Sequence, residues 1–175
     1  MGLKSLLAKP FADYIAKRVY DAAKNAVANQ EKIMMELVQT AAQTQFGKDH
    51  HFSNVRNYED FKAAVPIRDY EALRYYIDKM VDGESDVLWP GKPLYLAKTS
   101  GTTSGVKYIP LTKASIPNHI NSARNALLMY VHETRNTDFI SGKMIFLQGS
   151  PVLGEKNGIK TARLSGIVYH FVPGY

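Results

Sequence analysis

The sequence contains no cysteine among its 175 residues. This absence excludes disulfide bonds, thiolate zinc sites and a cysteine nucleophile. The chain also lacks an apolar stretch long enough to cross a bilayer. The apolar start, from Met1 to Pro10, is too short for a signal peptide and has no small-residue cleavage site after it. We therefore expect a cytoplasmic protein with no membrane partner.

Long runs of one charge are absent as well. The formal net charge is +6, but the 22 basic and 16 acidic residues are interleaved, with no block of five like charges. Such a pattern gives little support for a nucleic-acid partner, because a basic surface around a nucleotide site explains the positive net charge equally well. The apolar fraction of 45% is that of an ordinary globular domain with a sizeable core.

The five histidines show no metal-ligand spacing. His50 and His51 are adjacent, and the other three are scattered singly. Adjacent histidines on a helix cannot both face one metal, and no carboxylate stands at ligand spacing from them. The sequence therefore predicts surface or core histidines and no metal site.

A loop rich in glycine and hydroxyl groups is the most informative stretch. Residues 98–110 read K-T-S-G-T-T-S-G-V-K-Y-I-P, between apolar runs at 93–97 and 108–111 that predict two strands. Small residues let the backbone approach a ligand, and glycine permits turns that point successive N–H groups at one centre. The hydroxyls add donors and Lys107 adds a positive charge. This composition favours a ligand with several anionic oxygens, and phosphate fits best.

The spacing of the loop excludes three common motifs. Gly101 and Gly105 have three residues between them and Val106 separates Gly105 from Lys107, whereas a Walker A loop has four residues between its glycines and a lysine adjacent to the second one. The dinucleotide fingerprint G-x-G-x-x-G is absent. A nucleophile elbow needs serine where Thr103 stands, and a helix after it. A polar hairpin turn without a ligand accounts for the loop equally well.

The loop resembles the phosphate-binding motif of acyl-adenylate-forming enzymes, Thr-Ser-Gly-Thr-Thr-Gly-x-Pro-Lys. Residues 99–103 match it, and Lys107 falls at the distance of the motif's lysine. The second glycine is displaced by one position to Gly105, and Val106 stands where proline is usual. The continuation Lys-x-Ile-Pro-x-Thr, from Lys107 to Thr112, is similar to the Gretchen-Hagen auxin-responsive family of acyl acid amido synthetases.

Landmarks before the loop extend this resemblance. They are Phe46-Gly47, Phe61, Val65-Pro66-Ile67, Tyr70, Ile77 and Gly83-Glu84, in the family's order and spacing. The resemblance is strong over residues 37–115 and loose over the whole chain. Phenylacetate–coenzyme A ligases share a weaker version of the pattern and are the rival family.

The patterns predict an α/β fold in which N-terminal helices are followed by a mixed sheet. Residues 3–46 keep helical spacing, with Pro10 dividing a short leader from a longer segment and Gly47 as a left-handed stop. Residues 48–57 read as a loop. A helix from residue 58 should end before Pro66, and Asp69 should cap a second helix that ends at Gly83.

Beyond the loop, the patterns predict one helix and several strands. Thr112 should cap a helix over about 113–134. Apolar runs at 143–147, 152–153 and 159–164 predict strands, with turns at 149–151 and 154–158. The resemblance implies that residues 1–175 are an incomplete part of the large N-terminal domain of an adenylate-forming enzyme. Its helical region would span about 1–90, and its phosphate loop and sheet about 91–175.

The resemblance also implies a reaction. A carboxylic acid would attack the α-phosphorus of ATP to give an acyl-adenylate, and the acyl group would pass to an amine such as an amino acid, or to coenzyme A in the rival family. The residues implied in ATP binding are Thr99, Ser100, Gly101, Thr102, Thr103, Ser104, Gly105 and Lys107. Lys107 would be the catalytic group that neutralises the leaving pyrophosphate, with Mg²⁺ sharing the charge.

Length separates this chain from the enzymes it resembles. They are several hundred residues long, and nothing in residues 116–175 matches their later motifs. We therefore expect the chain to need the remainder of such an enzyme, and alone to bind nucleotide weakly and catalyse nothing. The alternative outside enzymology is a basic helical interaction module that touches an anionic partner.

Overall fold

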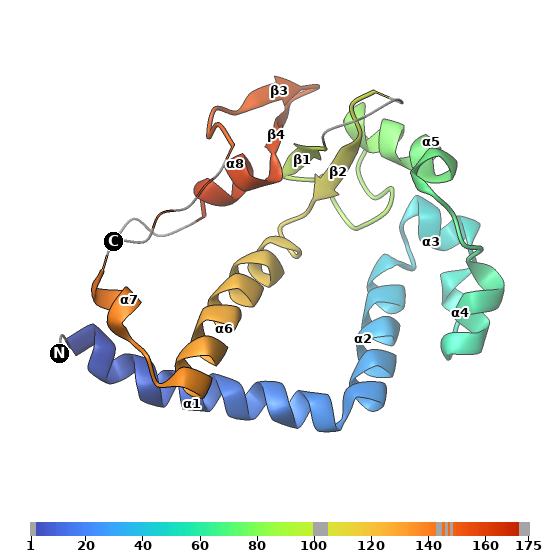
Figure 1. Ribbon diagram of the computed structural model, residues 1–175. Coiled ribbons are helices and arrows are strands. Elements are labelled where there is room, and N and C mark those ends of the chain that lie inside the picture. The colour runs from blue at the N-terminus through green and yellow to red at the C-terminus, as the bar shows by residue number, and fades with distance from the viewer. Residues whose placement is uncertain (1–2, 100–104, 143–144, 146, 148, 172–175) are drawn as a thin grey trace. The chain divides into compact units, whose positions relative to one another are not determined.

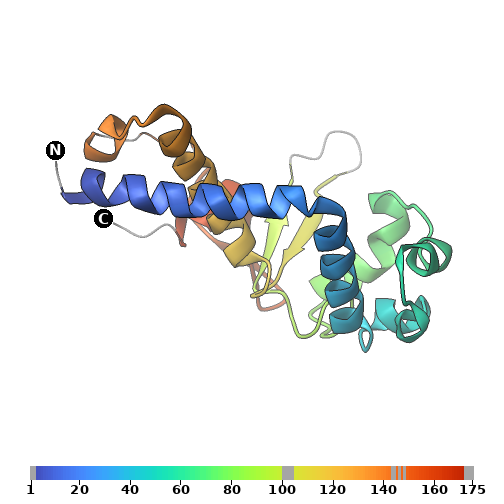
Figure 2. The same ribbon diagram turned by 90° about the horizontal axis from the view of Figure 1, so that it is seen from below.

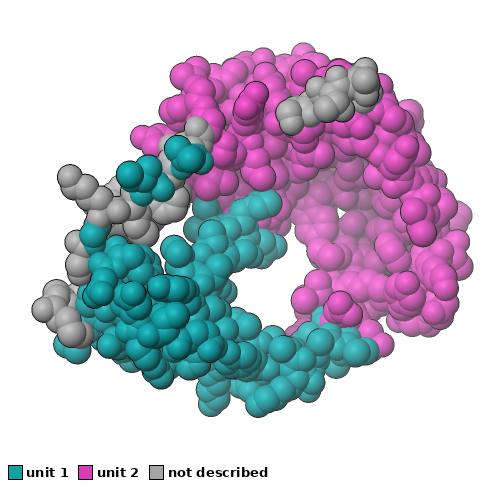
Figure 3. Space-filling view, viewed as in Figure 1, with its two compact units in different colours: residues 1–29, 117–148 teal, residues 30–116, 149–175 magenta. Residues whose placement is uncertain are grey.

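A computed structural model describes residues 3–99, 105–142, 145, 147 and 149–171. The chain divides into two compact units (Figure 3). The first unit comprises residues 1–29 and 117–148, and the second comprises residues 30–116 and 149–175.

The first unit is helical. It contains α1 (Leu3–Lys24), nearly all of α6 (Ile116–Thr134) and α7 (Asp138–Ser141), which packs against α1. The Asp13 carboxylate joins α1 to the end of α6, because it accepts hydrogen bonds from His132 and Arg135, both at 2.6 Å. Tyr20 adds a hydrogen bond from its hydroxyl to Glu133.

The second unit places helices before a mixed sheet, which confirms the predicted α/β class. Its helices are α2 (Ala26–Ala41, crossed by the unit boundary), α3 (Gln45–Asp49), the 3₁₀ turn η1 (Phe52–Asn54), α4 (Tyr58–Ala64), α5 (Tyr70–Val81) and α8 (Leu164–Tyr169). The strands are β1 (Tyr95–Lys98), β2 (Tyr108–Leu111), β3 (Gly154–Lys156) and β4 (Ile159–Arg163), in the order β2-β1-β4-β3 (Figure 1). β1 is antiparallel to β2 and parallel to β4.

The core of the second unit fixes α5 against the sheet. Leu96 in β1 is fully buried and packs with Ile77 and Val81 of α5 and with Ile159 of β4. Asn157, in the turn between β3 and β4, donates from Nδ2 to the Val81 carbonyl at 2.9 Å. Because α5 is held at both the core and this turn, its N-terminal residues have a defined place beside β2 (Figure 1).

Several predicted boundaries are confirmed. α4 ends at Ala64, before Pro66, and the Asp69 carboxylate accepts from the Ala72 N–H at 2.9 Å at the start of α5. The strands on both sides of the loop are β1 and β2. Thr112 caps a turn rather than the helix itself: the Ser115 N–H donates to its hydroxyl at 3.2 Å, and α6 begins one residue later.

The predicted helix over residues 3–46 is wrong in three respects. α1 runs unbroken through Pro10, so no separate leader exists in residues 3–24 (Figure 2). The helix breaks at Asn25, whose side-chain amide donates to the Asp21 carbonyl at 3.1 Å; such local bonds compete with helical ones. α2 then ends at Ala41, and the predicted loop at 48–57 includes the end of α3 and η1.

Gly47 is required for a reason that the sequence did not reveal. It lies inside α3, where its φ is not left-handed, and a Cβ atom added there would stand 2.1 Å from the Ala41 carbonyl oxygen. The glycine therefore permits close backbone packing between α3 and the end of α2, and the prediction of a left-handed stop is wrong.

The C-terminal strands also differ from the predictions. Ile145 and Leu147 lie in no strand, while Lys143, Met144 and Phe146 lie outside the described residues. Residues 152–153 are not a strand either, and the predicted turn at 154–158 begins with β3. The turn itself is Asn157-Gly158, both with left-handed φ (50° and 79°), which suits a two-residue hairpin. Leu164 starts α8 instead of ending β4.

Replacing Gly47 with alanine should destabilise the chain. Alanine normally favours a helix over glycine, but here the added methyl overlaps backbone atoms, so we expect a loss of roughly 1–3 kcal/mol in the free energy of unfolding. The control is Gly142→Ala, where the nearest atoms are 3.7 Å from the added Cβ. Urea unfolding measures both, and equal stability of the two variants would contradict the close packing.

Candidate functional site

The loop predicted to bind phosphate connects β1 to β2. Its described ends are joined by a hydrogen bond from the Thr99 N–H to the Lys107 carbonyl at 3.0 Å. Thr99, Gly105 and Lys107 are therefore brought to one end of the hairpin. Five predicted site residues lie outside the described part of the chain: Ser100, Gly101, Thr102, Thr103 and Ser104.

Gly105 adopts a left-handed backbone conformation in the connection between β1 and β2. Its φ is +86°, a left-handed value that residues with a Cβ rarely adopt. A Cβ built at this position would meet no heavy atom within 4 Å, so the space beside it is open. The displaced second glycine of the motif thus lies where a ligand can approach the backbone closely.

Lys107 is held by two residues from the first turn of α5. Its Nζ atom lies 3.4 Å from Glu71 Oε1 and 4.9 Å from the centre of the Tyr70 ring. The lysine side chain is 33% exposed, so part of the ammonium remains accessible to an anion. Glu71 also accepts a hydrogen bond from Arg74 at 3.0 Å.

Tyr70 also contacts the backbone beside Lys107. Its hydroxyl oxygen accepts from the Tyr108 N–H at 2.9 Å, and the hydroxyl donates to the Tyr108 carbonyl at 3.3 Å. The Tyr108 ring is itself in contact with a cation, because Lys156 Nζ lies 4.8 Å from its centre. Sequence reasoning marked Tyr70 only as a landmark and missed Glu71, because the lysine that Glu71 faces lies 36 positions further along the chain.

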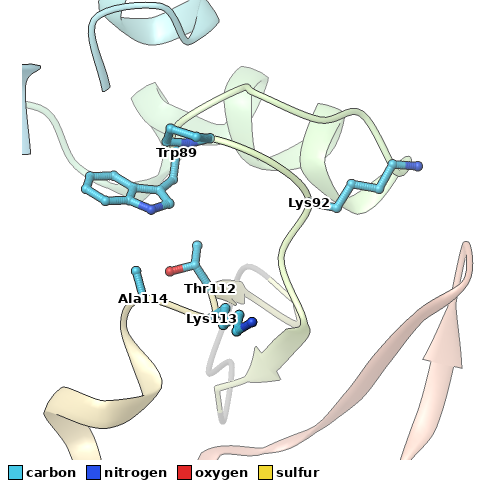
Figure 4. Close-up of a pocket in the computed structure, with 6 residues that line it drawn as sticks. Trp89, Lys92, Thr112, Lys113 and Ala114 are labelled. Atoms are coloured by element: carbon cyan, nitrogen blue, oxygen red, sulfur yellow. The ribbon is translucent and has the colours of Figure 1, made fainter. Parts of the chain in front are cut away.

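A hollow of about 380 Å³ lies at the opposite end of the hairpin (Figure 4). It is lined by Trp89, Pro90, Lys92, Thr112, Lys113 and Ala114. The indole of Trp89 faces Thr112 and Ala114, whereas Lys92 extends away from them (Figure 4). Because the strands run from this end to the loop end, the hollow is separate from Lys107.

Asp86 forms two hydrogen bonds with Gly91 and so joins the two ends of the segment that contains Trp89. The Gly91 N–H donates to Asp86 Oδ1 at 2.7 Å, and the Asp86 N–H donates to the Gly91 carbonyl at 3.1 Å. The bond from the Gly91 N–H, with a smaller contribution from Ser85, lowers the pKa of the Asp86 carboxyl below its ordinary value.

His50 is a core residue, as predicted for the histidines. It is 5% exposed, stacks on Phe46 with ring centres 4.0 Å apart, and its Nδ1 lies 2.8 Å from the Phe46 carbonyl oxygen. Across the described ranges, no three histidine, aspartate or glutamate side chains gather as metal ligands would. None of the described helices combines the length and apolar character needed to cross a membrane.

Comparison with known proteins shows the family to which the chain is similar. Residues 15–172 match the family model described as the GH3 family N-terminal domain. The indole-3-acetic acid-amido synthetase GH3.15 of Arabidopsis thaliana is 33% identical over 115 residues, which cover 64% of this chain and 19% of that protein. The jasmonoyl–L-amino acid synthetase JAR4 of Nicotiana attenuata is 24% identical over 149 residues, covering 83% and 25%.

Solved structures show the same fold. The GH3.15 acyl acid amido synthetase matches with a TM-score of 0.75 at 23% identity, over 85% of this chain and 27% of that one. A structure of AtGH3.15 in complex with 2,4-DB gives a TM-score of 0.74 over 87% of this chain. The chain spans about a fifth to a quarter of the length of these curated relatives.

The lowered pKa of Asp86 predicts a pH dependence of stability. Since the folded chain binds this proton less readily than the unfolded chain, the carboxylate stabilises the fold above the ordinary pKa of 3.8. That contribution is lost as the pH falls through the lower folded-state pKa. The difference in urea midpoint between the wild type and Asp86→Asn should therefore shrink as the solution is acidified. A difference that stays constant down to about pH 2 would show that the charge of Asp86 is not involved.

Proposed function

Because this chain belongs to the GH3 family, whose N-terminal domain it matches over residues 15–172, we propose that its β1–β2 hairpin binds the phosphates of ATP while a carboxylic acid is activated. The observation that carries the proposal is the pairing of two features at one end of the hairpin. Gly105 holds an open left-handed turn, and Lys107, two residues further along the chain, has a partly exposed side chain. Backbone N–H groups and a lysine are the donors that phosphoryl oxygens need.

The proposed reaction has two steps. A carboxylate oxygen of the acid attacks the α-phosphorus of ATP, the bond to the bridging oxygen breaks, and pyrophosphate leaves with its electron pair. An amine then attacks the acyl carbon and AMP departs. Lys107 would neutralise charge on the leaving pyrophosphate, a role in which a positioned cation strongly favours the transition state.

Magnesium fits this site as a companion of the nucleotide. Residues 95–111 contain no carboxylate, so the hairpin offers phosphate donors rather than a metal cage. Mg²⁺ usually keeps phosphate and water ligands, with only one or two protein carboxylates. When bound to the phosphates it would withdraw charge from them.

The proposed acceptor is an amino acid rather than coenzyme A. One curated relative is named an amido synthetase, and another is named a jasmonoyl–L-amino acid synthetase. We propose that residues 1–175 form an incomplete adenylate-forming domain that binds nucleotide weakly without the remainder. Support comes from the small share of each relative that the chain covers, 19% and 25%.

Lys107→Ala should weaken binding of MgATP to the chain by about tenfold to a hundredfold. The estimate follows from a charge-assisted hydrogen bond, which contributes roughly 1.5–3 kcal/mol, at 1.4 kcal/mol per tenfold. Equilibrium dialysis with labelled ATP measures the dissociation constant. The control is Lys79→Ala, since Lys79 has the same kinds of contact: a tyrosine ring at 5.0 Å and Glu84 at 3.5 Å.

Equal losses in the two lysine variants would contradict the proposal, because they would reflect net charge alone. Binding that falls steeply with salt, extends to any polyanion and ignores Lys107 would instead favour the basic interaction module. In a longer protein that carries this chain, Lys107→Ala should lower ATP–pyrophosphate exchange by a similar factor.

A further inference from the structure

We propose that Tyr70 and Glu71 form a holder for Lys107: Tyr70 positions the strand that carries the lysine, and Glu71 is its resting partner, which polyphosphate displaces. This inference rests on the proposed function of the hairpin and adds to it. Both residues come from the first turn of α5, whose start is fixed by the Asp69 cap.

The first step is the position of β2 at the edge of the sheet. Among the strands of the described residues, the order β2-β1-β4-β3 gives β2 a single strand neighbour. In an antiparallel pair, successive residues point their backbone groups alternately toward the partner strand and away from it. The Lys107 carbonyl accepts from Thr99 and so faces β1, which means that the N–H and C=O groups of Tyr108 face outward.

One hydroxyl group, that of Tyr70, binds both of these outward-facing backbone groups. It accepts from the Tyr108 N–H at 2.9 Å and donates to the Tyr108 carbonyl at 3.3 Å, so both outward groups have a partner. Pro110, the next residue whose backbone faces outward, has no N–H to satisfy. The two bonds fix the residue directly after Lys107, and the lysine stem leaves the backbone at a defined point.

The second step concerns the charge of Lys107. Its ammonium lies 3.4 Å from Glu71 Oε1, with side chains 33% and 42% exposed. A pair this accessible to water stabilises weakly, by about 0–1 kcal/mol. A polyphosphate carries several charges against the one of Glu71, and its oxygens at Lys107 would stand close to a like charge. The ligand should therefore displace the carboxylate from the lysine.

Arg74 gives the displaced carboxylate a second cation. Its Nη1 atom lies 3.0 Å from Glu71 Oε2, the oxygen that does not face Lys107. Glu71 can keep this bond when Lys107 turns to a ligand, so the exchange leaves no carboxylate unpaired. The arrangement is that of a resting contact rather than of a permanent ion pair.

Lys79 and Tyr75 of the same helix form a matched arrangement with Glu84, which lies beyond the end of α5, and no hairpin is involved. Lys79 Nζ lies 5.0 Å from the Tyr75 ring centre and 3.5 Å from Glu84 Oε2. The Tyr75 hydroxyl accepts from the Gln45 side chain at 3.2 Å instead of from a strand backbone. Tyr75→Phe and Glu84→Gln are therefore controls for Tyr70→Phe and Glu71→Gln.

The test measures binding of inorganic tripolyphosphate to the full chain by calorimetry in EDTA, so that no metal contributes. Glu71→Gln should tighten binding by about twofold to fivefold, because a competing charge worth up to about 1 kcal/mol is removed. Tyr70→Phe should weaken it by roughly threefold to tenfold, because Tyr108 loses its outer partner and the lysine is less well placed. Both controls should leave the dissociation constant unchanged.

A double-variant comparison separates the resting contact from a general charge effect. In the Lys107→Ala background, Glu71→Gln should tighten binding less, because only the repulsion between Glu71 and the ligand remains to be removed. Weaker or unchanged binding by Glu71→Gln, or the same gain with and without Lys107, would overturn the inference. If Tyr70→Phe lowers the melting temperature below the assay temperature, the Glu71 comparison decides alone.

The outcome also separates this inference from the proposed function. If Lys107→Ala binds tripolyphosphate as well as the wild type does, the hairpin is not a phosphate site and both proposals fail. If Lys107→Ala weakens binding while the Tyr70 and Glu71 variants behave as their controls do, only the holder is wrong.

Discussion

Two hydrogen bonds between one tyrosine hydroxyl and one backbone residue connect the helices of the second unit to its candidate site. Tyr70 lies on α5, and α5 is packed through Ile77 and Val81 onto the centre of the sheet. The hydroxyl therefore holds β2, which has one strand neighbour among the described strands, against this well-anchored helix. The placement of Lys107, and with it the proposed grip on phosphate, depends on this connection.

In the proposed site, the loop would be arranged for an anion before the anion binds. Gly105 supplies an open left-handed turn, and Lys107 rests between an aromatic face and a carboxylate that holds it weakly. A weak partner keeps the ammonium in place without removing its capacity to bind, because an exposed ion pair contributes little. The hollow beside Trp89 lies at the other end of the hairpin (Figure 4).

Sequence patterns predicted the parts that depend on local chemistry. Asp69 as a cap, the end of α4 before Pro66 and the two strands around the loop follow from preferences within a few residues. The misses depend on contacts far along the chain or on unrecognised turns. Position 47 must be glycine because a Cβ atom there would overlap the Ala41 carbonyl oxygen. The turn at Asn157-Gly158 is shorter than the predicted turn at 154–158. Glu71 faces a lysine 36 positions away, a contact that no local sequence pattern records.

The most direct test is a titration of the ¹⁵N-labelled chain with MgATP, followed by the amide resonances in NMR spectra. If the hairpin binds the phosphates, the amides of Gly105, Lys107 and Tyr108 should shift together and saturate, with the amide of Glu71 responding at the same concentrations. Shifts confined to Trp89, Thr112 and Lys113, or small shifts spread over surface lysines without saturation, would contradict a phosphate site at Lys107.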